Sequence, residues 1–207
     1  KDSLQTALQS VTIHDCTGFS VNINSGEQKQ LTQGAGTHRV SFNSDFTYMF
    51  DAMSSFDTPN QERIYNLKKG KVARELLTAP NPYTGLTMGT AEYGTIKAAD
   101  GKTDLNYRLI KPSNFDETKK YPVLVYVYGG PHAQLITNSW GGGASLWMYW
   151  MAEQGYLVYT VDNRGSANRG FEFESVIHRQ LGTNEMADQL KGVEHLKSMP
   201  FVDSDRL

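Results

Sequence analysis

Tyr128 ends a run of strand-forming residues and is followed at once by Gly129, Gly130 and Pro131. Its phenol is protonated at neutral pH, so the hydroxyl can donate a hydrogen bond to negative charge that develops on a reacting oxygen. Because glycine has no side chain, the backbone of this corner can come close to a ligand. The residue types therefore indicate an anion-stabilising corner. The alternative is a half-buried tyrosine at a strand end, with its hydroxyl in water.

A second glycine-containing corner runs from Asp162 through Arg164 and Gly165 to Ser166, and it also follows a strand-forming run. In open α/β sheets, ligands bind beyond the carboxyl ends of the strands. We therefore expect both corners to lie at the site. Asp162 and Arg164 could pair and brace the turn, which predicts a structural role near the site.

None of the five histidines has the position expected of a catalytic base. His132 follows Tyr128 closely, but in α/β-hydrolases the nucleophilic Ser, the acid and the His come in that order, so His132 is too early. The others have no better claim, and the last of them is expected to be solvated: His14, His38, His178 and His195. The chain has no Gly-x-Ser-x-Gly to carry a nucleophile, and no His-Glu-x-x-His or comparable pair, so we expect no metal site.

The composition bounds the class of protein. The chain has 207 residues, 39% of them hydrophobic, which suffices for one medium domain or two small ones. A net charge of −2 without a basic stripe argues against nucleic-acid binding. No apolar run approaches the roughly 18 residues that span a bilayer. The single cysteine, Cys16, excludes an intrachain disulfide and is expected to be structural.

Residues 1–84 have the pattern of short strands separated by turns. Two strands with a Ser-Gly turn are predicted within 19–32, two more around Asn43-Ser44-Asp45, and a hairpin with a Lys-Gly tip within 62–77. Such spacing favours antiparallel sheet, either a sandwich or propeller blades. A segment rich in proline and glycine then predicts a boundary between Tyr83 and Leu86.

Residues 85–207 alternate between strand and helix patterns. The predicted elements are a hairpin over 91–112 with an Asp-Gly turn, a strand over 121–128 covered on both faces, a helix over 144–154 stopped by Gly155, a strand over 156–162 and a helix over 183–197. This order indicates parallel α/β architecture. One face of the last helix is expected to carry Met186, Leu190, Val193 and Leu196, with Thr183 as its N-cap. An aromatic group is expected in the core: Trp140, Trp147, Tyr149 and Trp150.

Four segments together resemble the dipeptidyl peptidase IV branch of the prolyl oligopeptidase family, most closely its bacterial prolyl tripeptidyl aminopeptidases. They are "YPVLVYVYGGPHAQ", "VDNRGSANRG", "RQLGTNEMADQLKGVEHLK" and "FVDSDRL". The resemblance is strong from about residue 88 and looser before it. It implies antiparallel strands of the last blades of a β-propeller over 1–84, followed by the N-terminal half of an α/β-hydrolase domain, a partial α/β sheet, over 85–207.

The resemblance also implies roles for the two corners. Tyr128 would donate its hydroxyl to the oxyanion hole, and a structural role near the site is implied for Gly129, Gly130, Asp162, Arg164, Gly165 and Ser166. The family's nucleophilic Ser, its Asp and its His lie beyond position 207, so none of them is expected in this chain. No cofactor is implied.

The function implied for the parent protein is a serine exopeptidase that releases N-terminal di- or tripeptides after proline. Its partners would be peptides with proline near the N-terminus, and its compartment the periplasm or cell envelope. There are two alternatives. One is another α/β-hydrolase, such as an acylaminoacyl peptidase or an esterase, and the other is a non-catalytic binding homologue. The chain alone is expected to be inactive. It is also expected to form homo-oligomers or exchange strands through open sheet edges.

Overall fold

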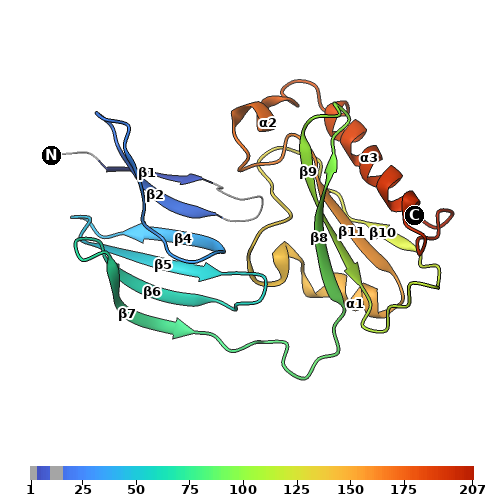
Figure 1. Ribbon diagram of the computed structural model, residues 1–207, viewed down its shortest axis with the longest axis horizontal. Helices are drawn as coiled ribbons and strands as arrows, with labels where there is room; N and C mark the ends of the chain where they lie inside the picture. The colour runs from blue at the N-terminus through green and yellow to red at the C-terminus, as the bar shows by residue number, and fades with distance from the viewer. Residues whose placement is uncertain (1–3, 10–15) are drawn as a thin grey trace. The chain divides into compact units, whose positions relative to one another are not determined.

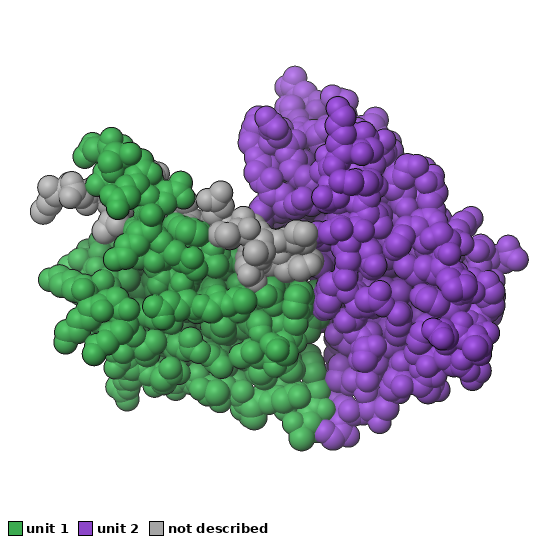
Figure 2. Space-filling model, viewed as in Figure 1, with its two compact units in different colours: residues 1–84, 137–143 green, residues 85–136, 144–207 purple. Residues whose placement is uncertain are grey.

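The computed structural model describes residues 4–9 and 16–207, with side chains from residue 16 onward. The chain divides into two compact units (Figure 2). Unit 1 comprises residues 1–84 and 137–143, and unit 2 comprises residues 85–136 and 144–207. Each unit is described separately below.

Unit 1 contains two antiparallel sheets, one of three strands in the order β1-β2-β3 and one of four in the order β4-β5-β6-β7 (Figure 1). The strands are β1 (Leu4–Gln9), β2 (Thr17–Asn22), β3 (Gln28–Gln30), β4 (Thr37–Phe42), β5 (Tyr48–Ser54), β6 (Gln61–Asn66) and β7 (Lys71–Thr78). Each strand of the larger sheet lies beside the next one in sequence, as in the blade of a propeller. The predicted antiparallel strands are therefore confirmed.

Alternation along β5 shows why this sheet forms. Met49, Asp51 and Met53 are buried, whereas the residues between them are less so, which places every second side chain on the inner face. Asp51 is within hydrogen-bond distance of His38 on β4, whose Nδ1 lies 3.0 Å from the carboxylate. Both side chains are fully buried, and the Nε2 of His38 lies 3.2 Å from the carbonyl oxygen of Gly34, so both ring nitrogens of His38 have partners within unit 1.

Residues 137–143 pack with unit 1, although they follow the loop that carries Tyr128. The side-chain oxygen of Asn138 accepts a hydrogen bond from the backbone N–H of Phe56 (2.9 Å). Trp140 N donates to the hydroxyl of Ser54 (3.1 Å), and its ring stacks on Tyr83 with 5.7 Å between centroids. This segment includes the short helical turn η1 (Trp140–Gly143).

Unit 2 is built on a mixed sheet with the strand order β10-β11-β9-β8, in which β10 and β11 are parallel and the other neighbours antiparallel. The strands are β8 (Thr90–Lys97), β9 (Asp104–Lys111), β10 (Val123–Val125) and β11 (Leu157–Asp162). The helices are α1 (Leu146–Glu153), α2 (Phe171–Ser175) and α3 (Asn184–Ser198). This arrangement confirms the predicted partial α/β sheet.

The core of unit 2 lies on both faces of β11, all of whose residues are buried. Val158 packs in a cluster with Met148 and Ala152 of α1, whereas Tyr159 and Val161 belong to a second cluster with Leu196 of α3. Because successive side chains of a strand point to opposite faces, α1 and α3 cover opposite sides of the sheet.

The strand predicted over 121–128 is shorter than expected. Only β10 forms, and Tyr126 N still donates to Tyr159 O (2.8 Å) before the chain leaves the sheet. The next residues, Val127 and Tyr128, are exposed, so the prediction of a strand covered on both faces is wrong for them. The run of strand-forming residues is longer than the strand, and its last residues, Val127 and Tyr128, belong to the loop that follows.

The start and the packed face of α3 also differ from expectation. Thr183 is at the N-cap position, but its hydroxyl donates to Gln180 O, and the carboxylate of Glu185 accepts the N–H of Gly182 instead. Met186 and Leu190 are exposed. The buried face consists mainly of polar and small residues: Glu185, Asp188, Gln189, Gly192 and Leu196.

Candidate functional site

The two corners singled out in the sequence lie together at one edge of the sheet. Because β10 and β11 are adjacent and parallel, the loops that follow them leave the sheet at the same edge. Asn163 Nδ2 donates to the carbonyl oxygen of Gly129 over 3.4 Å. The loop of Tyr128 and the turn of Asp162 are therefore in direct contact.

Tyr128 presents its phenol to the outside of unit 2. Its side chain is 59% exposed, and its hydroxyl forms no hydrogen bond with any residue that the structure describes. A Cβ at Gly130 would lie 3.1 Å from Tyr128 Cε1, so the ring lies close against Gly130. Gly129 has a left-handed φ of 76°, which favours glycine. The corner can therefore hold a hydroxyl donor that remains available to a ligand.

Asp162 is buried and bonded to the end of the Tyr128 loop. Its two oxygens accept hydrogen bonds from the backbone N–H groups of Leu135 (2.9 Å) and Ile136 (3.0 Å). Burial raises the pKa of Asp162 to about 6, although the two N–H donors and the nearby Arg108 favour the charged form. The expected pair of Asp162 with Arg164 does not form, because each side chain has other partners.

Arg164 binds the polar face of α3. Its Nε and Nη2 donate to the two oxygens of Asp188, each at a distance of 2.9 Å, and its Nη1 donates to Asp100 at 3.0 Å. Asp188 is fully buried, and its hydrogen bonds to the guanidinium raise the pKa of Arg164. Arg164 thus braces the turn after β11, but against a helix and the β8–β9 hairpin rather than against Asp162.

Gly165 and Ser166 close the turn tightly. Gly165 has φ 101°, and an added Cβ would lie 2.5 Å from Ile177 Cδ1. The N–H of Gly165 donates to Phe173 O (2.8 Å), and the buried Ser166 donates its N–H to Asn163 O (3.1 Å). The hydrogen bonds of both residues in this turn are made by their backbone.

Sequence reasoning missed the residues of α3 that hold this turn. Gln189 Nε2 donates to Val161 O (3.0 Å) and to Asn163 Oδ1 (2.8 Å). A Cβ at Gly192 would lie 2.9 Å from Val161 Cγ2, so glycine lets the helix approach β11. The sequence could have indicated this face, because Asp188, Gln189 and Gly192 lie on one side of a helix. The prediction instead assigned the apolar residues of the helix to its buried face.

Among the residues from 16 onward, the histidines form no catalytic group. His132 is exposed, and its Nδ1 lies 2.8 Å from Glu174 Oε1. His195 is not solvated as expected: its Nε2 is buried without a hydrogen-bond partner, and burial lowers its pKa. His178 is exposed and His14 lies outside the described residues. From residue 16 onward, no serine hydroxyl is hydrogen-bonded to a histidine ring.

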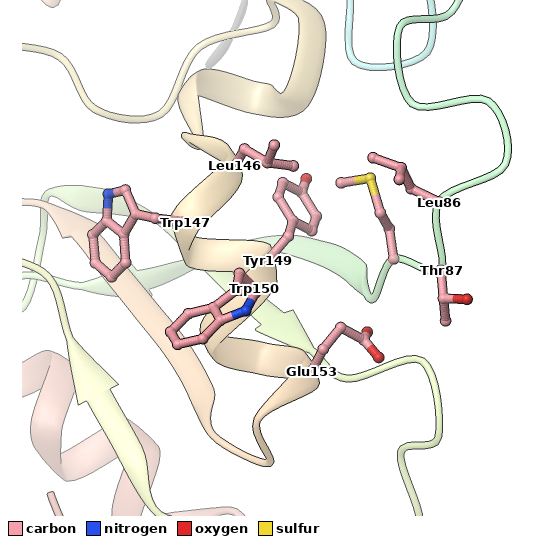
Figure 3. Close-up of a pocket in the computed structure, with 8 residues that line it drawn as sticks. Leu86, Thr87, Leu146, Trp147, Tyr149, Trp150 and Glu153 are labelled. Carbon is pink, nitrogen blue, oxygen red and sulfur yellow. The ribbon is translucent and has the colours of Figure 1, made fainter.

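Two of the hollows on unit 2 are large enough to hold a ligand. The first, of about 530 Å³, is an apolar groove between α1 and the segment before β8 (Figure 3). Its one carboxylate, Glu153, already accepts hydrogen bonds from Ser113 N and Oγ. Because polar groups do not converge there, this groove lacks the features of a catalytic site.

The prediction that the four aromatic residues Trp140, Trp147, Tyr149 and Trp150 share a core is wrong. Tyr149 is buried, but Trp147 and Trp150 are 42% and 59% exposed. Trp140 belongs to unit 1, where it stacks on Tyr83. The helical spacing of these rings therefore did not predict a shared core position.

The second hollow, of about 990 Å³, adjoins the Tyr128 loop. It is lined by Pro131 and His132 of that loop and, from α2 and the residues after it, by Phe171, Glu174 and Ile177. Space for a ligand therefore exists next to the corner that carries the phenol.

Two further observations concern the described part of the chain. No group of three or more His, Cys, Asp or Glu side chains is arranged there to hold a metal ion. None of the helices in that part combines the length and the apolar character needed to cross a membrane.

Comparison with known proteins adds the family. The model of the "Prolyl oligopeptidase family" matches residues 144–207. Human dipeptidyl peptidase 8 is 29% identical over 195 residues, which cover 89% of this chain and 21% of that protein. Dipeptidyl-peptidase 5 of Porphyromonas gingivalis is 31% identical over 195 residues, covering 91% of this chain and 27% of that protein.

A solved structure covers the whole chain. The crystal structure of a Bacteroides ovatus protein described as a dipeptidyl aminopeptidase IV superposes with a TM-score of 0.89 at 47% identity, covering 100% of this chain and 29% of that one. The chain thus spans between 21% and 29% of the length of these relatives. Its sheets, its Tyr128 corner and these similarities lead to one conclusion: the chain belongs to the prolyl oligopeptidase family, in the branch that contains the dipeptidyl peptidases.

Proposed function

We propose that the parent protein is a serine exopeptidase that releases N-terminal dipeptides after proline, with Tyr128 as an oxyanion-hole donor. The observation that carries this proposal is the exposed phenol of Tyr128 at the carboxyl edge of two parallel strands. The relatives named above are called dipeptidyl peptidases, which favours dipeptide over tripeptide release.

The chemistry needs a donor at this place. A serine hydroxyl attacks the carbonyl of the residue after which cleavage occurs, its proton passes to a histidine, and the carbonyl oxygen becomes an oxyanion. The Tyr128 hydroxyl donates a hydrogen bond to that oxyanion. The C–N bond then breaks, the amine leaves with the proton, and water hydrolyses the acyl-enzyme.

The proposal assigns only the donor to residues 1–207 and places the nucleophile, acid and base outside them. The chain alone should therefore not turn over peptides, because covalent catalysis depends on the nucleophile. The residues that recognise the free amino group and the proline are likewise outside the assignment.

The test uses the full-length parent protein with Gly-Pro-p-nitroanilide and Ala-Ala-Pro-p-nitroanilide, each with wild type and Tyr128→Phe. Phenylalanine keeps the ring against Gly130 and removes only the donor. We expect turnover of the dipeptide substrate and a fall in kcat of roughly 10²–10³-fold in the variant, as when one oxyanion donor is removed. Tyr156→Phe, at another partly exposed tyrosine of unit 2, is the matched control.

The other outcomes are equally informative. Turnover of the tripeptide substrate alone would assign a tripeptidyl peptidase. Turnover of acylated peptides or esters instead would assign another hydrolase of this fold, and a folded protein without any turnover would assign a binding homologue. An unchanged kcat in Tyr128→Phe would refute the role of the phenol.

We also propose a periplasmic or envelope-facing location, which rests on the resemblance to the family alone. Fractionation of the source cells, with immunodetection of the full-length protein, tests it. Recovery of the protein with the cytoplasmic fraction would refute it.

A further inference from the structure

The loop that carries Tyr128 is held along its length by the turn after β11. Beyond the contact with Gly129, the carbonyl oxygen of Ala133 accepts the N–H of Ala167 (3.0 Å). The side chain of Gln134 accepts a hydrogen bond from Asn168 Nδ2 (3.0 Å). These contacts are at the surface or involve backbone alone, so they leave the end of the loop to be fixed by other groups.

That end is held by two buried charged side chains. Asp162 accepts the N–H groups of Leu135 and Ile136, while Arg108 Nη1 donates to the carbonyl oxygen of Leu135 (3.0 Å). Asp162 is 2% exposed and Arg108 is 1% exposed. Because they lie on the adjacent strands β11 and β9, the sheet itself fixes their separation.

The arrangement requires a carboxylate in particular. Two consecutive N–H groups point at one side chain, and each of its oxygens accepts one of them. An asparagine of the same shape has one oxygen and one NH₂ group, so it would oppose a donor to one of the N–H groups. Ile136, whose N–H is one of the two, is itself fully buried, so that N–H has no access to water as a substitute.

We propose that Asp162 is a positioning residue for the Tyr128 oxyanion donor: by fixing the Leu135–Ile136 end of the loop, it holds the phenol where the oxyanion forms. The inference rests on the function proposed above. Asp162 touches no reacting atom, since its oxygens are engaged with the loop backbone. Misplacement of a catalytic group by about 1 Å can cost about 10²-fold in rate, so a loosened loop should be measurable.

The experiment is a double-mutant cycle in the full-length protein, with Gly-Pro-p-nitroanilide as the probe. Asp162→Asn should lower kcat roughly 10- to 100-fold in the wild-type background, with KM changed less than about threefold. In the Tyr128→Phe background the same substitution should lower kcat by less than about threefold, because the donor it positions is already absent. Glu153→Gln is the matched control, since Glu153 also binds a backbone N–H but lies on α1. It should leave kcat unchanged in both backgrounds.

The two proposals fail in different ways. If Tyr128→Phe alone leaves kcat unchanged, the proposed function is wrong. If Tyr128→Phe lowers kcat but Asp162→Asn lowers it equally in both backgrounds, Asp162 does not act through Tyr128 and this inference is overturned. Should Asp162→Asn not fold, Asp162→Glu replaces it in the cycle, because it keeps a carboxylate but displaces its oxygens from the N–H groups of Leu135 and Ile136. Its loss of kcat should likewise vanish in the Tyr128→Phe background, and a loss of equal size in both backgrounds would overturn the inference.

Discussion

The buried carboxyl of Asp162 should make the stability of the protein depend on pH in a defined direction. Its pKa is raised from 3.8 to about 6 in the folded state, chiefly by burial. The folded protein therefore binds this proton more tightly than the unfolded chain does. Its contribution to stability is complete below about pH 4 and is lost as the pH rises through about 6.

The magnitude follows from the shift. About two pKa units at about 1.4 kcal/mol each give about 3 kcal/mol, and the near-complete burial of Asp162 means that solvent screening does not reduce it much. Asp162→Asn removes the titration and leaves every other titrating group in place. The stability of wild type relative to this variant should therefore fall by about 3 kcal/mol between pH 4 and pH 7.

Thermal denaturation of both full-length proteins at pH 4, 5, 6 and 7 measures this difference. For a domain of 150–250 residues, about 3 kcal/mol corresponds to a change of roughly 6–12 °C in the Tm difference. A constant difference would refute the reasoning, because it would mean that Asp162 titrates at an ordinary pKa. A difference that grows in favour of wild type with rising pH would show that the two N–H donors and Arg108 outweigh burial.

Two substitutions in the turn after β11 and one association experiment on the sheet edges give further tests. Arg164→Ala should lower the free energy of unfolding by about 3–5 kcal/mol, since it leaves the buried carboxylate of Asp188 unpaired; Arg179→Ala, at an exposed arginine, should change it by less than about 0.5 kcal/mol in the same denaturant titration. Gly165→Ala combines left-handed strain with a methyl clash and should cost about 2–5 kcal/mol, whereas Gly170→Ala, with a similar φ but open space, should cost only about 1–2 kcal/mol. Because β7 and β8 end their sheets in the described strand orders, the isolated chain should self-associate, and a monomer by light scattering at high concentration would contradict this.

Much of the fold could be predicted, because turn residues, apolar runs and helix-ending glycines indicate the local structure in which they occur. The Asp-Gly turn at Asp100 fixed the β8–β9 hairpin, and the apolar run before Asp162 predicted β11, whose residues are all buried. Gly155, with φ 89°, follows α1 as expected of a residue that ends a helix. These features depend on neighbours in sequence.

The errors concern partners that are distant in sequence. Asp162 precedes Arg164 by two residues, which suggested a pair, but Asp188 lies on α3 and offers two fully buried oxygens to Arg164. The face of α3 was misassigned for the same reason, because its polar residues are buried by the turn that they hold. Placement of the two corners at one edge could be predicted, since it requires only that β10 and β11 be parallel neighbours.

The packing of residues 137–143 with unit 1 has a consequence for biosynthesis. The N-terminal part of a chain leaves the ribosome first, so the sheet β4–β7 emerges before Asn138 and Trp140 have been translated. Until then, the hydroxyl of Ser54 and the ring of Tyr83 lack the partners that they have in the finished unit. Unit 1 is therefore completed only after the loop that carries Tyr128 has been synthesised. A single cut after residue 84 would therefore leave residues 137–143 of unit 1 on the fragment that contains unit 2.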